Sequence, residues 1–302
     1  MKKDLLTLRD LSCGELEELF ALTGKLKRER GKVDFRPLAG KSIGLIFAKS
    51  STRTRVSFEV GVHELGGNPL YLDQSKMQIG RGETVADTAH VLSRYLHGIV
   101  IRTFAHADVE ELAREATFPV VNALTDEYHP CQILADLYTI LEYSGTLKVK
   151  TVFVGDGSSN IANSLMLAAK LTGMKLVVAA PREYAPNPAI LAECAPNAEW
   201  CVDPDEAVRG ADYIYTDVWV SMGFEAERAA RLAKLAPYQV NKRMMELAAP
   251  NAKLLHCLPA HRGEELTAEV MDSDASIVFD EAENRLHVQK AVLAMLFRSR
   301  AR

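Results

Sequence analysis

Hydroxyl and guanidinium side chains are packed together at residues 51–55, Ser51-Thr52-Arg53-Thr54-Arg55. A strand-like apolar run, residues 42–47, leads directly into them, and a helical pattern follows from Val56. A helix start offers unpaired N–H groups and the positive end of the dipole, so hydroxyls there cap the helix or bind an oxyanion. Arginines at this end are unfavourable without an anion. The segment therefore predicts a phosphate-type site, with an exposed capping box and solvated arginines as the plainer alternative.

Three further places carry reactive side chains, each just after a predicted strand. His129-Pro130-Cys131-Gln132 opens a helix and suits binding of a carbonyl or an amide, although proline at a helix start also occurs without function. Asp217 suits a cationic amine, or caps a turn. Cys257 lies in residues 256–265, which are dense in reactive types, but no protease signature surrounds it and a Cys–His mechanism would also need a base and an orienting group.

Nucleotide signatures are weak in this chain. The phosphate-loop pattern G-x-x-x-x-G-K-[ST] is absent. Residues 155–160 resemble half of a dinucleotide fingerprint, but the third glycine is missing and the next strand runs into Pro181-Arg182 rather than an acidic residue. A nicotinamide cofactor is therefore not favoured. Residues 76–84 form a polar loop that reads equally well as a plain surface turn.

The elements that must position these side chains alternate between strands and helices. Strands are predicted at 42–47, 70–72, 99–101 and 119–123, and again at 151–155, 175–178, 213–215 and 253–255. Helical patterns occupy 15–26, the segment after 51, 129–141, 162–171, 188–195, 241–247 and 289–297. This alternation predicts an α/β protein with two doubly wound domains, each a mostly parallel sheet with helices on both faces.

Residues 1–147 and 148–285 are the predicted domains, and a C-terminal helix at 286–302 is expected to pack back on the first. In open α/β sheets, ligands bind beyond the carboxyl ends of the strands. Arg102 ends one predicted strand and Asn160 follows another, as do the segments described above. This recurrence in both halves predicts one cleft between two domains.

Composition sets broad limits on function. The chain has 302 residues, 48% of them hydrophobic, which suits two soluble domains. A net charge of −4 argues against a general nucleic-acid binder, and no apolar run is long enough to span a bilayer. The N-terminus lacks a signal-peptide pattern, so a cytoplasmic location is expected. Five cysteines without a C-x-x-C pair indicate neither a disulfide framework nor a zinc site.

Taken together, the motifs resemble the aspartate/ornithine carbamoyltransferase family. The resemblance spans nearly the whole chain and is carried by residues 47–59, 129–132 and 256–263. Asp217 with Ser221-Met222-Gly223, and the motif His256-Cys257-Leu258-Pro259, are similar to the ornithine branch. The aspartate branch brings a lysine from the loop at 76–84, where Gln78 stands at the matching position here and Lys76 lies close by.

The resemblance implies a set of site residues. Those for carbamoyl phosphate are Ser51, Thr52, Arg53, Thr54, Gln78, Arg102, His129, Pro130, Cys131, Gln132, Cys257, Leu258 and Arg285. Those for ornithine are Asn160, Asp217, Ser221 and Met222. The residues implied in the chemical step are Arg102, His129, Asp217 and Cys257. Asp217 and Cys257 both remain candidates for handling the proton of the amine. Ser159-Asn160 departs from the family's usual pair of asparagines.

The implied reaction is attack of the ornithine δ-amine on the carbamoyl carbon, giving citrulline and phosphate with no metal or organic cofactor. By resemblance the enzyme is a homotrimer with shared active sites, in which Gln78 reaches a neighbouring subunit. The compact chain favours arginine biosynthesis over arginine breakdown. Transfer to aspartate, putrescine or an acylated ornithine is one alternative. A non-catalytic protein that binds anions or amino acids is another.

Overall fold

The computed structural model describes residues 4–32, 34–220 and 225–298. The chain divides into two compact units, one made of Met1–Tyr138 and Glu283–Arg302 and the other of Thr139–Ala282. The boundaries fall within α5 (Pro130–Ser144) and α12 (Val278–Arg298), so each of these helices has residues in both units. Each unit is built on a parallel sheet flanked by helices, which confirms the predicted α/β class.

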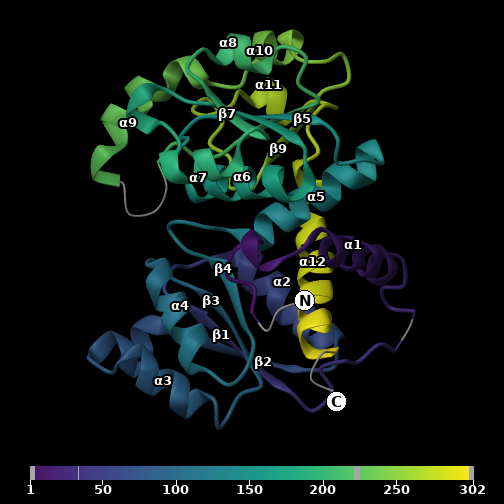
Figure 1. The fold of residues 1–302 in the computed structure, drawn as a ribbon, viewed down its shortest axis with the longest axis vertical. Helices are drawn as coiled ribbons and strands as arrows, with labels where there is room; N and C mark the ends of the chain where they lie inside the picture. Colours follow the sequence, from purple (N-terminus) through teal and green to yellow (C-terminus); the bar gives the residue numbers. More distant parts are fainter. Residues whose placement is uncertain (1–3, 33, 221–224, 299–302) are drawn as a thin grey trace. The chain divides into compact units, whose positions relative to one another are not determined.

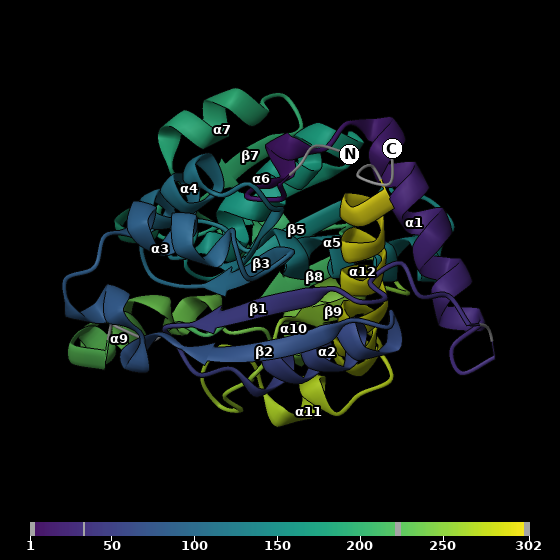
Figure 2. The same cartoon turned by 90° about the horizontal axis from the view of Figure 1, so that it is seen from below.

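The first unit contains a four-stranded parallel sheet in the order β2-β1-β3-β4. Its strands are β1 (Ser42–Phe47), β2 (Asn68–Asp73), β3 (Gly98–Arg102) and β4 (Val120–Leu124). Figure 2 shows β1 between β2 and β3. All five residues of β3 are buried, because helices cover both faces of the sheet. This explains why its sequence is a continuous apolar run rather than an alternating one.

Helices α3 (Val85–Leu92) and α4 (His106–Glu115) cover one face of this sheet (Figure 1), where Ile46, Ile99 and Ile101 join their apolar side chains in one core cluster. Helices α2 (Thr52–Glu64) and α12 lie on the other side (Figure 1). A side chain in place of Gly98 would meet the ring of Phe297 on α12. Lys27, on α1 (Cys13–Arg28), donates to Asn284 of α12 at 2.7 Å, which ties α1 to the same layer.

The second unit contains a five-stranded parallel sheet in the order β7-β6-β5-β8-β9. Its strands are β5 (Lys150–Val154), β6 (Lys175–Ala179), β7 (Ala198–Cys201), β8 (Tyr213–Thr216) and β9 (Lys253–His256). Helices α8 (Pro204–Val208), α10 (Lys242–Leu247) and α11 (Ala268–Met271) share a core cluster with one face of the sheet. Helices α6 (Asn160–Thr172) and α7 (Pro188–Cys194) lie on the opposite side, and α9 is Arg228–Leu235 (Figure 1).

Both sheets are doubly wound. In the first unit the chain runs from β1 outward to β2 and then crosses to β3 and β4. In the second it runs from β5 to β6 and β7 and then crosses to β8 and β9. The crossing places β1 beside β3 and β5 beside β8, and it is at such switch points that loops at the carboxyl ends open a binding site. Ser51 follows β1, Arg102 ends β3, Asn160 follows β5 and Asp217 follows β8, whereas residues 129–132 follow β4 and Cys257 and Leu258 follow β9.

The short helices α3, α4, α8, α9 and α11 were not predicted from the sequence, and two further elements differ from the prediction. Strand β7 was not predicted, because it is a half-exposed edge strand in which charged and apolar residues mix. The predicted C-terminal helix at 286–302 is part of α12, which already begins at Val278, while residues 299–302 lie outside the described structure. Among the described residues, no helix has both the length and the apolar character needed to cross a membrane.

Candidate active site

The anion-type segment lies where expected, at the start of α2 after β1. Ser51 is the N-cap: its backbone is extended and its hydroxyl accepts from the Thr54 N–H at 3.4 Å and donates to the Thr54 hydroxyl at 2.9 Å. Arg53 is half-buried in the first turn and Thr52 is exposed there. The helix start therefore presents hydroxyl, guanidinium and backbone N–H groups at the positive end of its dipole.

Arg285 reaches this helix start from α12. Its guanidinium donates to the Thr54 hydroxyl at 2.8 Å, and both side chains are buried. The two residues are more than two hundred positions apart in the sequence, so their contact arises from the packing of α12 beside α2. The structure thus brings Arg285, predicted as a site residue, directly to the Ser51–Thr54 turn.

Arg102 and His129 belong to the same unit. Arg102 ends β3, pairs in register with Phe47 at the end of β1 and is buried. His129 is also buried, immediately before Pro130 at the start of α5. Burial lowers the pKa of His129 well below its usual value, and the positive charges of Arg285 and Arg102 lower it further. His129 is therefore a neutral imidazole at pH 7, held among positive charges.

The remaining predicted residues of this segment are also buried. Burial raises the pKa of Cys131 to about 12, so this thiol stays protonated, and it donates to the Asn122 carbonyl at 3.3 Å. The amide of Gln132 donates to Asp136 at 2.9 Å. Cys131 is thus an inert packing group, whose contribution to a site comes from its backbone.

Arg55 and Gln78 differ from the buried residues described above, because both side chains are exposed. Arg55 forms an ion pair with Glu59 at 2.9 Å and its guanidinium stacks over the Tyr71 ring at 3.7 Å, so its charge is already matched one turn into the helix. Gln78 is exposed on the short 3-10 helix Gln78–Arg81, in the loop that follows β2. Its side chain is accessible from outside the chain.

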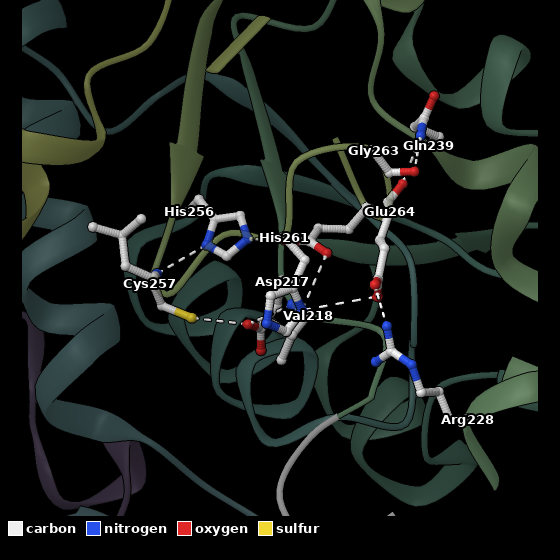
Figure 3. A network of polar contacts seen from close by, with 11 residues as sticks. Asp217, Val218, Arg228, Gln239, His256, Cys257, His261, Gly263 and Glu264 are labelled. Carbon is white, nitrogen blue, oxygen red and sulfur yellow. Dashed lines mark hydrogen bonds and ion pairs between the residues drawn. The ribbon is translucent and has the colours of Figure 1, made fainter. Parts of the chain in front are cut away.

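In the second unit, Asp217 and Cys257 meet at the ends of β8 and β9. The register that pairs Thr216 with His256 sets the two following residues side by side. The Cys257 thiol donates to the Asp217 carboxylate at 3.0 Å (Figure 3), which also accepts from the Val218 N–H at 2.7 Å. Burial raises the pKa of Asp217, and these two hydrogen bonds offset part of that effect.

Leu258 continues the same loop in an unusual backbone conformation. Its φ is 57°, which makes it the one non-glycine in the left-handed region among the described residues. Its N–H donates to Nδ1 of His256 at 2.8 Å. A branched residue in this region is strained and stays there only when its surroundings hold it.

The loop after β5 carries Asn160 at the first position of α6, half-buried, with Ser159 as the N-cap. Gly157 is required for packing: a Cβ there would lie 2.8 Å from the Tyr184 carbonyl oxygen and 2.9 Å from the Ala180 side chain. This close approach accounts for a glycine at this position without a bound dinucleotide. Ser221 and Met222, predicted to bind ornithine, lie outside the described residues.

The hydrogen bonds of His256 also bear on two other chemistries, a Cys–His catalytic pair and a metal site. Nδ1 of His256 accepts from the Leu258 N–H, and Nε2 lies 3.1 Å from Glu265, so His256 is not available as the base of a Cys–His pair with Cys257. Asp217, His256 and Cys257 offer metal-type ligand atoms within 4.8 Å of one another. Because both nitrogens of His256 are engaged, that set would have to break hydrogen bonds to hold an ion.

His256 contacts the predicted site but is not among the predicted site residues. It was noticed only as a neighbour of Cys257, yet its ring is completely buried and contacts the backbone of the predicted site. The available signal was its position as the last residue of a strand, directly before a reactive segment.

Comparison with known proteins places these features in one family. Residues 3–142 match the family model for the carbamoyl-P binding domain of aspartate/ornithine carbamoyltransferase, and residues 147–296 match the model for its Asp/Orn binding domain. An ornithine carbamoyltransferase of Syntrophus aciditrophicus is 52% identical over 303 residues, covering 98% of this chain and 100% of that protein.

Solved structures are similar over the same length. The ornithine carbamoyltransferase of Pyrococcus furiosus has a TM-score of 0.92 at 50% identity and covers 96% of both chains. The anabolic ornithine carbamoyltransferase of Campylobacter jejuni has a TM-score of 0.93 at 37% identity, covering 99% of this chain and 100% of that one.

Proposed function

Because this chain belongs to the aspartate/ornithine carbamoyltransferase family, we propose that it transfers the carbamoyl group of carbamoyl phosphate to the δ-amine of ornithine, giving citrulline and phosphate. In this reaction the amine nitrogen bonds to the carbamoyl carbon, the bond from that carbon to the phosphate oxygen breaks, and phosphate departs with the bonding electrons. The amine loses one proton. Each unit of the chain supplies groups suited to one substrate.

The first unit binds carbamoyl phosphate. Ser51, Thr52, Arg53 and Thr54 bind the phosphate at the start of α2, and Arg285 adds charge through its contact with Thr54. Hydrogen bonds to charged groups contribute about 1.5–3 kcal/mol each, so several hold a dianion without a metal. Arg53 also stabilises the charge that phosphate gains as it leaves.

His129 polarises the carbamoyl carbonyl. A neutral imidazole carries one N–H, and the lowered pKa keeps His129 in that form. Together with Arg102 it donates to the oxygen on which negative charge develops during attack. Gln132 and the backbone at Pro130 and Cys131 line the carbamoyl amide. Leu258 offers its backbone carbonyl to the same amide.

The second unit binds ornithine and takes the proton of its amine. An alkylammonium has a pKa near 10.4, so deprotonation at pH 7 costs about 4.6 kcal/mol. Asp217 orients the amine and accepts this proton: its carboxylate already accepts a hydrogen bond from Cys257, whose thiol is therefore protonated. Burial raises the pKa of Asp217, which makes it a better base than an exposed carboxylate. Asn160, Ser221 and Met222 bind the rest of the amino acid.

The observation that carries the proposal is the surrounding of His129. His129 is an imidazole kept neutral by burial and by the charges of Arg285 and Arg102, and Arg285 also contacts Thr54 at a helix start rich in hydroxyls. This surrounding suits a substrate that joins a phosphate to a polarisable carbonyl. A protein that only bound anions would not need the imidazole.

The proposal also covers the oligomeric state of the enzyme and its place in the cell. We infer a homotrimer in which the exposed Gln78 of one subunit completes the phosphate site of its neighbour. We also infer a cytoplasmic enzyme of arginine biosynthesis; the similarity to a relative described as anabolic supports that direction.

A panel of acceptors tests the proposal. The purified protein is incubated with carbamoyl phosphate and, separately, ornithine, aspartate, putrescine or N-acetylornithine, and carbamoylated products are measured by mass spectrometry. Citrulline from ornithine, with the other products at background, is the expected result. A dominant product from another acceptor would reassign the second unit's ligand, and binding without any phosphate release would indicate a non-catalytic protein.

A further inference from the structure

We propose that Glu265 and His256 form a positioning pair that holds Leu258 in its left-handed conformation and thereby sets the Leu258 carbonyl and the Cys257 thiol for carbamoyl transfer. The inference rests on the proposed function, since it assigns a purpose to the loop at the proposed reacting centre. Neither residue touches the reacting atoms in this account. Both act through the loop at Cys257 and Leu258.

The pair is a continuous chain of hydrogen bonds. Nδ1 of His256 accepts from the Leu258 N–H at 2.8 Å, so the ring's single proton is on Nε2. Nε2 lies 3.1 Å from Oε1 of Glu265 and donates to it. Both side chains are completely buried. A carboxylate behind a histidine fixes both the ring orientation and the tautomer, as it does in many catalytic sites.

Glu265 is itself held firmly. Its backbone carbonyl accepts from the Val240 N–H at 2.8 Å, and its Oε1 also accepts from the His261 N–H. The side-chain amide of Gln239 donates to the carbonyls of Gly263 and Glu264 at 3.0 and 2.8 Å (Figure 3). The carboxylate therefore has a fixed position before any substrate binds.

His256 is anchored on the strand side as well. It is the last residue of β9, and its N–H donates to the buried Glu281 carboxylate at 2.8 Å. Backbone and ring are thus held independently. Within this network, Leu258 has a strained backbone, with a φ of 57° in the left-handed region. A bond from its N–H to a rigid ring is a direct way to keep it there.

The pair also reaches Asp217 electrostatically. Burial is the main cause that raises the pKa of Asp217, and the negative charge of Glu265 raises it further. Loss of the Glu265 charge should therefore lower the pKa of Asp217. A lowered pKa of Asp217 after loss of the Glu265 charge is an effect that a purely structural role of the pair would not produce.

Two matched pairs of variants separate the bonds. In His256→Asn the amide oxygen takes roughly the place of Nδ1 and keeps the Leu258 contact, whereas in His256→Gln the amide takes roughly the place of Nε2 and keeps only the Glu265 contact. Glu265→Gln keeps an acceptor without the charge, and Glu265→Leu removes both. Glu264→Gln is the control, because Glu264 pairs with Arg228 instead (Figure 3).

We expect kcat for citrulline formation to fall about 10- to 100-fold in His256→Gln and Glu265→Leu, because a displaced reacting group loses rates of this order. His256→Asn and Glu265→Gln should lose less, and Glu264→Gln should stay near wild type. The affinity of all variants for inorganic phosphate, measured by calorimetry, should be unchanged. In Glu265→Gln the acid limb of the kcat profile should move to lower pH.

A readout independent of activity is the alkylation rate of Cys257, followed by peptide mass spectrometry with Cys201 as the internal reference. Faster alkylation of Cys257 in His256→Gln and Glu265→Leu is expected, because the loop loosens. If folded variants kept both kcat and the alkylation rate of the wild type, the pair would have no positioning role. If the wild type made no citrulline, the proposed function would fall, and alkylation alone would still decide whether the pair holds the loop.

Discussion

The Cys257 thiol donates to the Asp217 carboxylate at 3.0 Å, joining the loops that follow β8 and β9. In this contact the thiol donates and the carboxylate accepts. In the proposed reaction this leaves Asp217 as the proton acceptor and Cys257 as the group that orients it. Mechanistic predictions for the second unit follow from this pair.

Replacing Asp217 by asparagine should reduce kcat/KM for ornithine by about 10²- to 10⁴-fold, the contribution of a positioned general base. The amide keeps the shape of the side chain but cannot take the amine proton. Phosphate affinity should not change, because phosphate binds the first unit. Asp205→Asn, which removes a half-buried carboxylate paired with Arg243, is the control. Loss of phosphate binding with intact ornithine kinetics would mean that the ligands are assigned to the wrong units.

Arg53→Ala should weaken binding of carbamoyl phosphate by about 10- to 100-fold, since a hydrogen bond to a charged group is lost. Arg55→Ala should change it less than about threefold, because an exposed ion pair one turn apart contributes little. Isothermal calorimetry with phosphate, and the KM for carbamoyl phosphate, measure both variants. Equal losses in the two would argue for a general charge effect rather than a cradle at the helix start.

His129→Gln should lower kcat by about 10²- to 10³-fold, the usual cost of losing a donor to a developing oxyanion. The His129→Gln variant should also differ from the wild type in how its stability depends on pH. The folded pKa of His129 lies below its unfolded value, so the unfolded chain binds the proton more readily and His129 costs stability as pH falls below about 6.5. The difference in melting temperature between wild type and variant should therefore shift in favour of the variant between pH 7.5 and 5.5. A constant difference would show that His129 titrates normally.

Mixed trimers test the shared active site. Arg53→Ala and Gln78→Ala should each be weakly active alone. When the two are unfolded together and refolded, neighbouring subunits of different type restore one intact site, and activity should rise to about a quarter of wild type for random assembly. The mixture would stay at the level of its parents if Gln78 served its own subunit or none.

Much of the fold was predictable from its strands. The apolar runs before Ser51, Arg102 and Asp217 are short, buried and bounded by polar residues, which is typical of parallel sheets. The predicted family and transferase class are confirmed by the comparisons over nearly the full chain. The site residues predicted after these strands follow from one rule, that ligands bind beyond the carboxyl ends of parallel strands.

Other parts depend on packing that no local pattern reveals. The first half of α12 was not recognised because Glu281, Asn284 and Arg285 interrupt its apolar periodicity, yet all three are buried. Their partners come from distant elements, as in the contact between Arg285 and Thr54. The proposed role of Glu265 could not be predicted from the sequence for the same reason, because it depends on a hydrogen bond to the His256 ring across a loop.

The most direct test of the central claim is a stoichiometric transfer experiment. The protein is incubated with ornithine and carbamoyl phosphate labelled with ¹³C at the carbamoyl carbon, and labelled citrulline and inorganic phosphate are measured together. The account predicts equal amounts of the two products, and the rates of formation of both are strongly reduced in Asp217→Asn and in Arg53→Ala. Phosphate released without labelled citrulline, or no phosphate at all, would contradict it.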